Sequence, residues 1–123
     1  MTAAEQECLG RYVESLSDTL GDALEEVWLF GSAARGDMWA DFWPMRSDVD
    51  LLVVTAELLS PETRDELLGL TYPLYLECGR QISPAFRTGR ELNSQWAPLH
   101  AEVSRDGVRL WPPDEVRTAT VAE

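Results

Sequence analysis

The sequence VWLFGSAARGD at residues 27–37 is followed, after an interval, by SDVDLLVV at residues 47–54. Each stretch contains an apolar run of the length and composition of a buried β-strand. The first run ends at Gly31-Ser32, which predicts a strand that enters a tight turn. The second run begins directly after Asp48 and continues past Asp50. The two stretches therefore predict a pair of strands with polar residues at the end of one and at the beginning of the other.

Asp48 and Asp50 are two residues apart on the second predicted strand. Their side chains should project from the same face, with Cα atoms about 6–7 Å apart. Two negative charges this close are costly unless a cation or a proton lies between them. Carboxylate oxygens suit Mg²⁺, which prefers few carboxylates together with substrate phosphates and water. We therefore take Asp48 and Asp50 as candidate metal ligands and catalytic residues. The alternative is a solvent-exposed strand end whose acids alternate by chance.

The turn at Gly31-Ser32 is a candidate phosphate-binding site. Glycine lets the backbone approach a ligand closely, and amide groups at the start of a following helix donate to anions. Ala33-Ala34-Arg35 can begin such a helix. Arg35 would contact phosphate from this turn, or it would form a surface ion pair with Asp37. Gly31, Ser32 and Arg35 are thus the candidate nucleotide-binding residues. A metal site beside an anion-binding turn is what phosphoryl or nucleotidyl transfer requires.

Helical and strand patterns alternate along the rest of the chain. Capping signals and periodicity predict a helix from Thr2 to Gly21 and a second helix that opens at Ser60-Pro61 and is kinked or ended by Pro73. A third strand is expected at residues 81–87, where Pro84 favours an edge position or a bulge. A helix at residues 99–105 and a last strand at residues 108–111 follow. This order predicts an α/β (α+β) fold. We expect one domain over residues 1–111 and a flexible tail over residues 112–123.

Composition limits the function. The chain of 123 residues has 22 acidic and 10 basic residues, a net charge of −12, so unaided binding to nucleic acid is disfavoured. All basic residues are arginine, which excludes lysine-based covalent catalysis. No apolar stretch could cross a membrane and the N-terminus lacks a secretion signal, so a cytoplasmic protein is expected. Cys8 and Cys78 lack metal-site spacing and suggest no disulfide framework; we interpret them as small buried hydrophobic residues.

The combination of the glycine-serine turn with Asp48-Val49-Asp50 and the aliphatic run after it resembles the signature of the DNA polymerase beta-like nucleotidyltransferase superfamily. The chain looks like one of its minimal members. The resemblance implies a small mixed β-sheet flanked by helices, with Gly31 and Ser32 holding the distal phosphates of a nucleoside triphosphate such as ATP. It also implies that Asp48 and Asp50 bind Mg²⁺ or Mn²⁺, and that a nucleoside monophosphate moves to a hydroxyl of a small molecule, a protein or a nucleic-acid end. Minimal members often work with a small helical partner protein, and self-association is the other arrangement that the sequence leaves open.

The sequence departs from this signature in two places. The third metal carboxylate of the family lies on the next strand, where residues 81–87 offer only Ser83, and Glu77 is a weak substitute before it. A catalytically weak or inactive protein that binds metal or nucleotide and serves as an interaction subunit is therefore the alternative function. The second departure is a long interval between the two motif halves that contains Trp39, Phe42 and Trp43. These rings either pack as local core or form a flap that stacks on a base or joins a subunit interface.

The remaining candidates are expected to be structural. His100, the one histidine, lies on a predicted helix away from the motif. Arg80, Arg87 and Arg90 cluster around the third predicted strand, where they either line a site or solvate the sheet edge. We favour the second interpretation.

Overall fold

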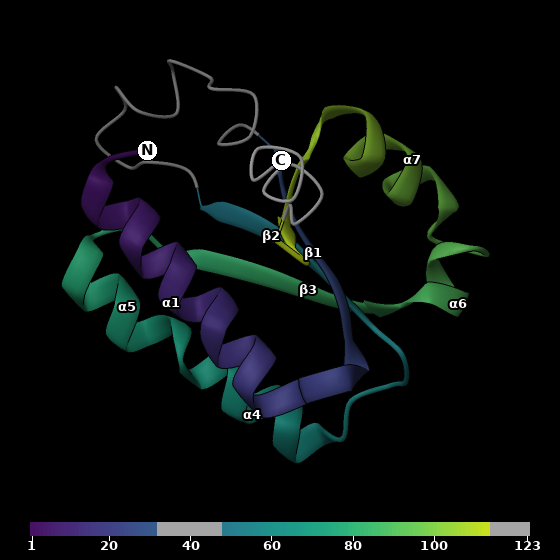
Figure 1. Ribbon diagram of the computed structural model, residues 1–123, viewed down its shortest axis with the longest axis horizontal. Coiled ribbons are helices and arrows are strands. Elements are labelled where there is room, and N and C mark those ends of the chain that lie inside the picture. The colour runs from purple at the N-terminus through teal and green to yellow at the C-terminus, as the bar shows by residue number, and fades with distance from the viewer. Residues whose placement is uncertain (32–47, 114–123) are drawn as a thin grey trace, which may run out of the picture.

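A computed structural model describes residues 1–31 and 48–113 of the chain. Within these residues four strands form one sheet in the order β3-β2-β1-β4 (Figure 1). The strands are β1 (Leu24–Phe30), β2 (Val49–Thr55), β3 (Ile82–Thr88) and β4 (Val108–Trp111). β1 pairs antiparallel with both β2 and β4, while β2 and β3 run parallel. The sheet is therefore mixed, as predicted, and the two motif strands β1 and β2 lie at its centre.

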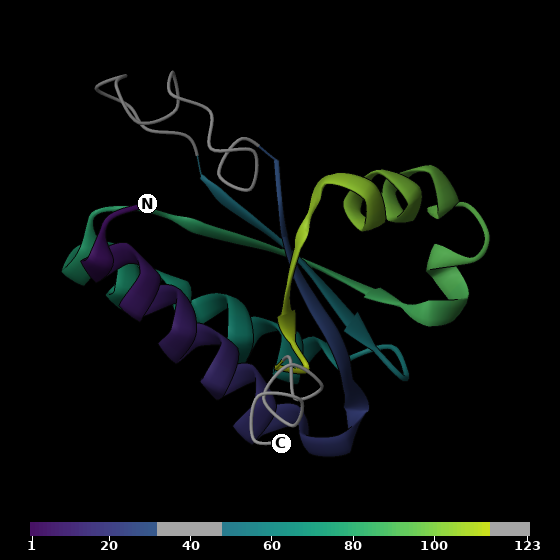
Figure 2. The same cartoon turned by 45° about the horizontal axis from the view of Figure 1, so that its top comes forward.

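Helices cover both faces of this sheet. They are α1 (Ala3–Leu20), a short 3₁₀ turn η1 (Gly21–Ala23), α4 (Pro61–Gly69), α5 (Thr71–Cys78), α6 (Gly89–Leu92) and α7 (Ala97–Asp106). Figures 1 and 2 show α1, α4 and α5 together on one face, and α6 and α7 on the other. None of the helices in the described part of the chain is long and apolar enough to span a membrane.

The first helix forms where its capping signals predict. The Thr2 side chain accepts from the Glu5 backbone N–H while the Glu5 side chain accepts from the Thr2 backbone N–H, which completes the expected capping box. The helix ends at Gly21, whose φ of 55° is unfavourable for other residues. Its apolar stripe, which includes Leu9, Tyr12 and Leu16, is buried in the main core.

Alternation along β2 divides the core into two layers. Leu51 and Val53 point toward α1 and α4, whereas Leu52 and Val54 belong to a second cluster with residues of α6 and α7. Both sets are fully buried or nearly so. Asp50 has the same parity as Leu52 and Val54, so it lies on the α6–α7 face of the sheet. The acidic end of β2 is thus the part of this face nearest the turn at Gly31.

One expectation about the sequence after β2 is confirmed and another is refined. β3 is an edge strand, as the proline at position 84 predicted. The helix that opens at Ser60 breaks at Leu70 rather than at Pro73, and Pro73 then lies in the first turn of a separate helix, α5. A proline is tolerated there because the first backbone N–H groups of a helix have no partner within it. The chain from Thr71 to Cys78 therefore packs as its own element against α1.

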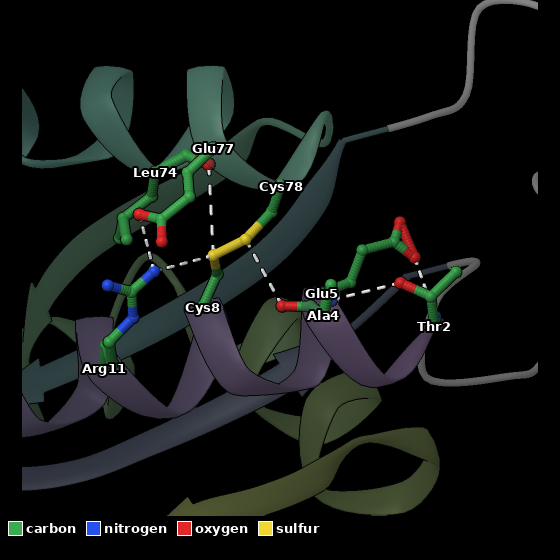
Figure 3. The surroundings of a disulfide bond; sticks show 8 residues. All are labelled: Thr2, Ala4, Glu5, Cys8, Arg11, Leu74, Glu77 and Cys78. Atoms are coloured by element: carbon green, nitrogen blue, oxygen red, sulfur yellow. Dashed lines mark hydrogen bonds and ion pairs between the residues drawn. A yellow bond between two sulfur atoms is a disulfide. The ribbon is translucent and has the colours of Figure 1, made fainter.

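The prediction that the two cysteines are unpaired was wrong. Cys8 on α1 and Cys78 at the end of α5 form a disulfide, with Cα atoms 6.6 Å apart (Figure 3). The error follows from α5, because its contact with α1 brings together residues that are 70 positions apart in sequence. Spacing alone does not reveal such a contact.

The prediction for Arg80 was also wrong. It does not solvate the sheet edge: its side chain is 2% exposed and pairs at 3.7 Å with the equally buried Glu5 of α1. Together with the disulfide, this ion pair ties the connection between α5 and β3 to the first turns of α1.

Candidate functional site

The two halves of the sequence motif meet at one end of the sheet. Phe30, the last residue of β1, is the strand partner of Asp50. Gly31 follows with a φ of 78°, and a Cβ atom on this residue would lie 2.6 Å from Asp50 Oδ2. Both the backbone conformation and the lack of space therefore require glycine at position 31. Gly31 therefore lies directly against the carboxylate.

On the other side of β2, the strand β3 brings Ser83 next to Asp50. In the parallel pairing of β2 with β3, Ser83 is the partner of Asp50. Its hydroxyl donates a hydrogen bond of 2.7 Å to Oδ2 of Asp48, which is exposed just before the first residue of β2. Asp48, Asp50, Gly31 and Ser83 thus form one cluster, and Ser83 occupies the position where the sequence led us to look for a third acid.

The ionised form of Asp50 is disfavoured in this cluster. Burial raises the pKa of Asp50, and the negative charge of Asp48 raises it further. A bound cation would relieve both effects, because it offsets the repulsion and replaces the lost hydration. The donor set of two carboxylates fits Mg²⁺ or Mn²⁺, which bind through one or two carboxylates plus phosphate oxygens and water. No third histidine, cysteine or acid joins them among residues 1–31 and 48–113.

Several predicted site residues fall outside the described residues. These are Ser32, Arg35 and the aromatic residues Trp39, Phe42 and Trp43. Of the predicted phosphate-binding turn, the structure places only Gly31. Residues 114–123, which make up most of the predicted tail, are likewise not described.

Glu77 is engaged away from the cluster. It forms a 2.7 Å ion pair with Arg11 on the outer side of α1 and α5, next to the disulfide (Figure 3). His100 is half-buried on α7 and lines a cavity of about 380 Å³ with Glu25, Glu26 and Asn93. This cavity includes none of the four cluster residues.

The sequence predicted no role for Trp96, and for Arg87 it favoured solvation of the sheet edge over a place in a site. The structure stacks them: the Arg87 guanidinium carbon lies 4.2 Å from the centre of the Trp96 ring. Arg87 lies on β3 in the same orientation as Ser83, so this pair shares a face with the acidic cluster. The sequence did contain a signal for this placement, because Arg87 follows Ser83 by four residues on the predicted strand and residues an even number apart project from the same face.

Gly31 at the end of β1 and the two aspartates at the start of β2 lie together, as the resemblance to nucleotidyltransferases implied. The chain belongs to the nucleotidyltransferase domain family, whose model matches residues 9–74. It is also 31% identical over 78 residues to a Methanocaldococcus jannaschii protein named "putative protein adenylyltransferase", a match that covers 63% of this chain and 74% of that protein.

Solved structures share the fold. The MNT antitoxin complex with a tri-AMPylated HEPN toxin of Shewanella oneidensis matches with a TM-score of 0.55 and 21% identity, over 94% of this chain and 78% of the other. A toxin-antitoxin complex with AMP-PNP matches with a TM-score of 0.55 and 22% identity, over 92% and 86% of the two chains. These similarities confirm the fold that the sequence resemblance implied.

Proposed function

We propose that this protein is a metal-dependent nucleotidyltransferase that moves a nucleoside monophosphate, with ATP as the donor, to a hydroxyl group. The observation that supports this proposal is the close approach of Gly31 to the Asp50 carboxylate, because Gly31 and the two aspartates are the residues that we take as phosphate-binding and metal-binding. The family match and the adenylyltransferase relative support the same class of reaction.

Each residue of the cluster has a distinct role in this proposal. Asp48 and Asp50 would hold Mg²⁺ or Mn²⁺, whose chemistry is to bind phosphate oxygens and offset the charge that develops during in-line displacement. Gly31 lets the backbone of the turn approach the distal phosphates, because no side chain stands between the backbone and the site. Ser83 fixes the orientation of Asp48 through their hydrogen bond.

The acceptor that fits best is a hydroxyl of a protein. The relative from M. jannaschii is named as a protein adenylyltransferase, and one structural neighbour is in complex with a tri-AMPylated toxin. The net charge of −12 disfavours an acceptor on nucleic acid unless another protein presents it. We therefore propose a small partner protein as both binding partner and acceptor. The proposed location is the cytoplasm, as expected from the sequence.

A second candidate function rests on Ser83. The hydroxyl at the expected third acid leaves no carboxylate beside Asp48 and Asp50, within the described residues, to accept the proton of the attacking hydroxyl. General-base assistance is typically worth roughly 10²–10⁴-fold in rate. A protein that binds metal and nucleotide but transfers slowly, or not at all, would then act as an interaction subunit.

Labelling of the purified protein separates these functions. The full chain would be incubated with α-labelled ATP, Mg²⁺ or Mn²⁺, and candidate acceptor proteins. We expect transfer that is lost in Asp50→Ala and kept in Asp22→Ala, a matched change at an exposed acid of η1. Calorimetric binding of ATP and Mn²⁺ without transfer would favour the interaction subunit. No binding of either ligand would contradict both candidates.

A further inference from the structure

The half-buried pair of Arg87 and Trp96 lies on the same face of the sheet as the acidic cluster. β3 aligns in register with β2, so that Ser83 pairs with Asp50, Ala85 with Leu52 and Arg87 with Val54. Residues that pair across parallel strands project from the same face. Trp96 packs against the cluster that contains Leu52 and Val54, which places its ring on this face as well.

The spacing along β3 matches the length of a nucleotide. Ser83 and Arg87 are four residues apart, which corresponds to about 13 Å along an extended strand. A nucleotide whose phosphates lie at Gly31 and the two aspartates could extend along this row until its base reaches Arg87. The residue between them, Ala85, has a small side chain that leaves room for such a ligand.

The row remains partly open to solvent along the edge of the sheet. Ser83, Ala85, Arg87 and Trp96 are all half-buried, whereas Leu52 and Val54 on the adjacent strand are 0% and 4% exposed. α6 and α7 therefore cover the β2 side of this face more completely than the β3 side. A ligand that starts at the acidic cluster therefore has accessible surface next to it along β3.

Arg87 itself is incompletely satisfied. Its Nη1 donates to the backbone oxygen of Phe86 at 2.7 Å, and its plane stacks on Trp96, but its buried Nε has no hydrogen-bond partner among the described residues. Of the described arginines that form no ion pair, Arg87 is half-buried, whereas Arg64, Arg90 and Arg109 are exposed. Stacked guanidinium and indole groups offer a flat surface and donors, which is what nucleobases bind.

We propose that Arg87 and Trp96 form the base-binding end of the nucleotide site. This inference rests on the proposed function, since it assumes that the triphosphate occupies the acidic cluster. The competing explanation is that the stacked pair only ties the connection between α6 and α7 to β3. The two explanations differ in which part of the nucleotide the pair affects.

The test compares a ligand that has a base with one that lacks it. Binding of AMP-PNP and of inorganic tripolyphosphate, each with Mn²⁺, would be measured by calorimetry for the wild type, Arg87→Gln, Trp96→Leu and the control Arg90→Gln. Arg90 is an exposed arginine of α6 three residues beyond Arg87, so its replacement makes the same change in charge. We expect both site variants to lose about tenfold in affinity for AMP-PNP. Affinity for tripolyphosphate should stay within error, and Arg90→Gln should bind both ligands like the wild type.

Other outcomes overturn the inference in distinguishable ways. Unchanged AMP-PNP affinity in both variants would leave only the structural tie, while equal loss for both ligands would place Arg87 at the phosphates. A wild type that binds neither ligand would contradict the proposed function as well. If Trp96→Leu or Arg87→Gln fails to fold by circular dichroism, Trp96→Phe and Arg87→Lys provide the same comparison with smaller changes in packing.

Discussion

The Ser83 hydroxyl donates to Asp48 Oδ2 at 2.7 Å, while its strand position makes it the direct partner of Asp50. Ser83 is therefore hydrogen-bonded to one aspartate of the cluster and is the strand partner of the other. It does so without adding charge, so the site carries two negative charges where a third acid would make three. If the cluster binds a metal ion as proposed, we expect the residue at position 83 to set the strength of that binding.

Ser83→Asp should convert the cluster into a three-carboxylate site. We expect roughly tenfold tighter Mn²⁺ binding, because affinity for hard cations rises with the number of charged ligands. Without metal the same change should lower stability, since a third like charge joins Asp48 and Asp50. Calorimetry with Mn²⁺ and thermal unfolding with and without EDTA measure the two effects. Transfer activity should rise as well, if proton acceptance limits it.

Ser104→Asp is the matched control, since Ser104 is exposed on α7. It adds the same charge away from the cluster and should leave Mn²⁺ affinity unchanged. If Ser83→Asp and Ser104→Asp behave alike, the strand position of Ser83 has no part in metal binding.

Gly31→Ala should damage both the turn and the metal site. The φ of 78° costs a residue with a Cβ atom roughly 1–2 kcal/mol, and the added methyl group meets Asp50 Oδ2. We expect lower stability in urea unfolding and weaker Mn²⁺ binding by calorimetry. Gly10→Ala is the control, because Gly10 lies inside α1 with nothing within 4 Å of a Cβ atom. It should instead stabilise the protein by roughly 0.5–1 kcal/mol. Equal effects from the two changes would argue against a special role of Gly31.

The sequence was sufficient to predict the centre of the molecule. Local signals decide these features: the capping box at Thr2, the apolar runs of β1 and β2, and the proline that marks β3 as an edge strand all lie within a few residues of what they predict. The approach of Gly31 to Asp50 was predictable for the same reason, since the motif halves flank adjacent strands. The expected glycine turn and aspartate pair are therefore found together.

Contacts between distant segments could not be read in the same way. Cys8 and Cys78 meet only because α5 packs on α1. Arg80, which lies between α5 and β3, is buried because it pairs with Glu5 of α1. Neither partner is identified by spacing or composition. Arg87 shows the same limit at the site, because its partner Trp96 follows a helix and a turn whose direction the sequence does not reveal.

Reduction of the disulfide should lower stability. Cys8 and Cys78 close a loop with a sequence separation of 70, for which the chain-entropy account gives roughly 4 kcal/mol. Urea unfolding of the wild type should therefore shift to lower denaturant in dithiothreitol. The Cys8→Ser/Cys78→Ser variant should unfold at this lower concentration with or without reductant. The control is alkylation of the wild type, unfolded without reductant. If both cysteines react, the disulfide does not form in solution.

Asp50 should make stability depend on pH in the absence of metal. Burial, with Asp48 nearby, raises the pKa of Asp50 in the folded protein above its ordinary value of 3.8. As pH rises between the unfolded and folded pKa values, the unfolded state loses its proton first, so this group lowers stability across that window and at neutral pH. Asp50→Asn should therefore be more stable than the wild type at pH 7 in EDTA, and the difference should vanish below the ordinary pKa. Unfolding free energies across this pH range measure the effect, with Asp22→Asn as an exposed control of equal charge change.

Mn²⁺ should reverse the order of stability of Asp50→Asn and the wild type at pH 7, because it stabilises the ionised wild-type site and has one ligand fewer in the variant. An Asp50→Asn protein that is less stable than the wild type in EDTA at every pH would contradict the view that the ionised carboxylate is held there for a cation.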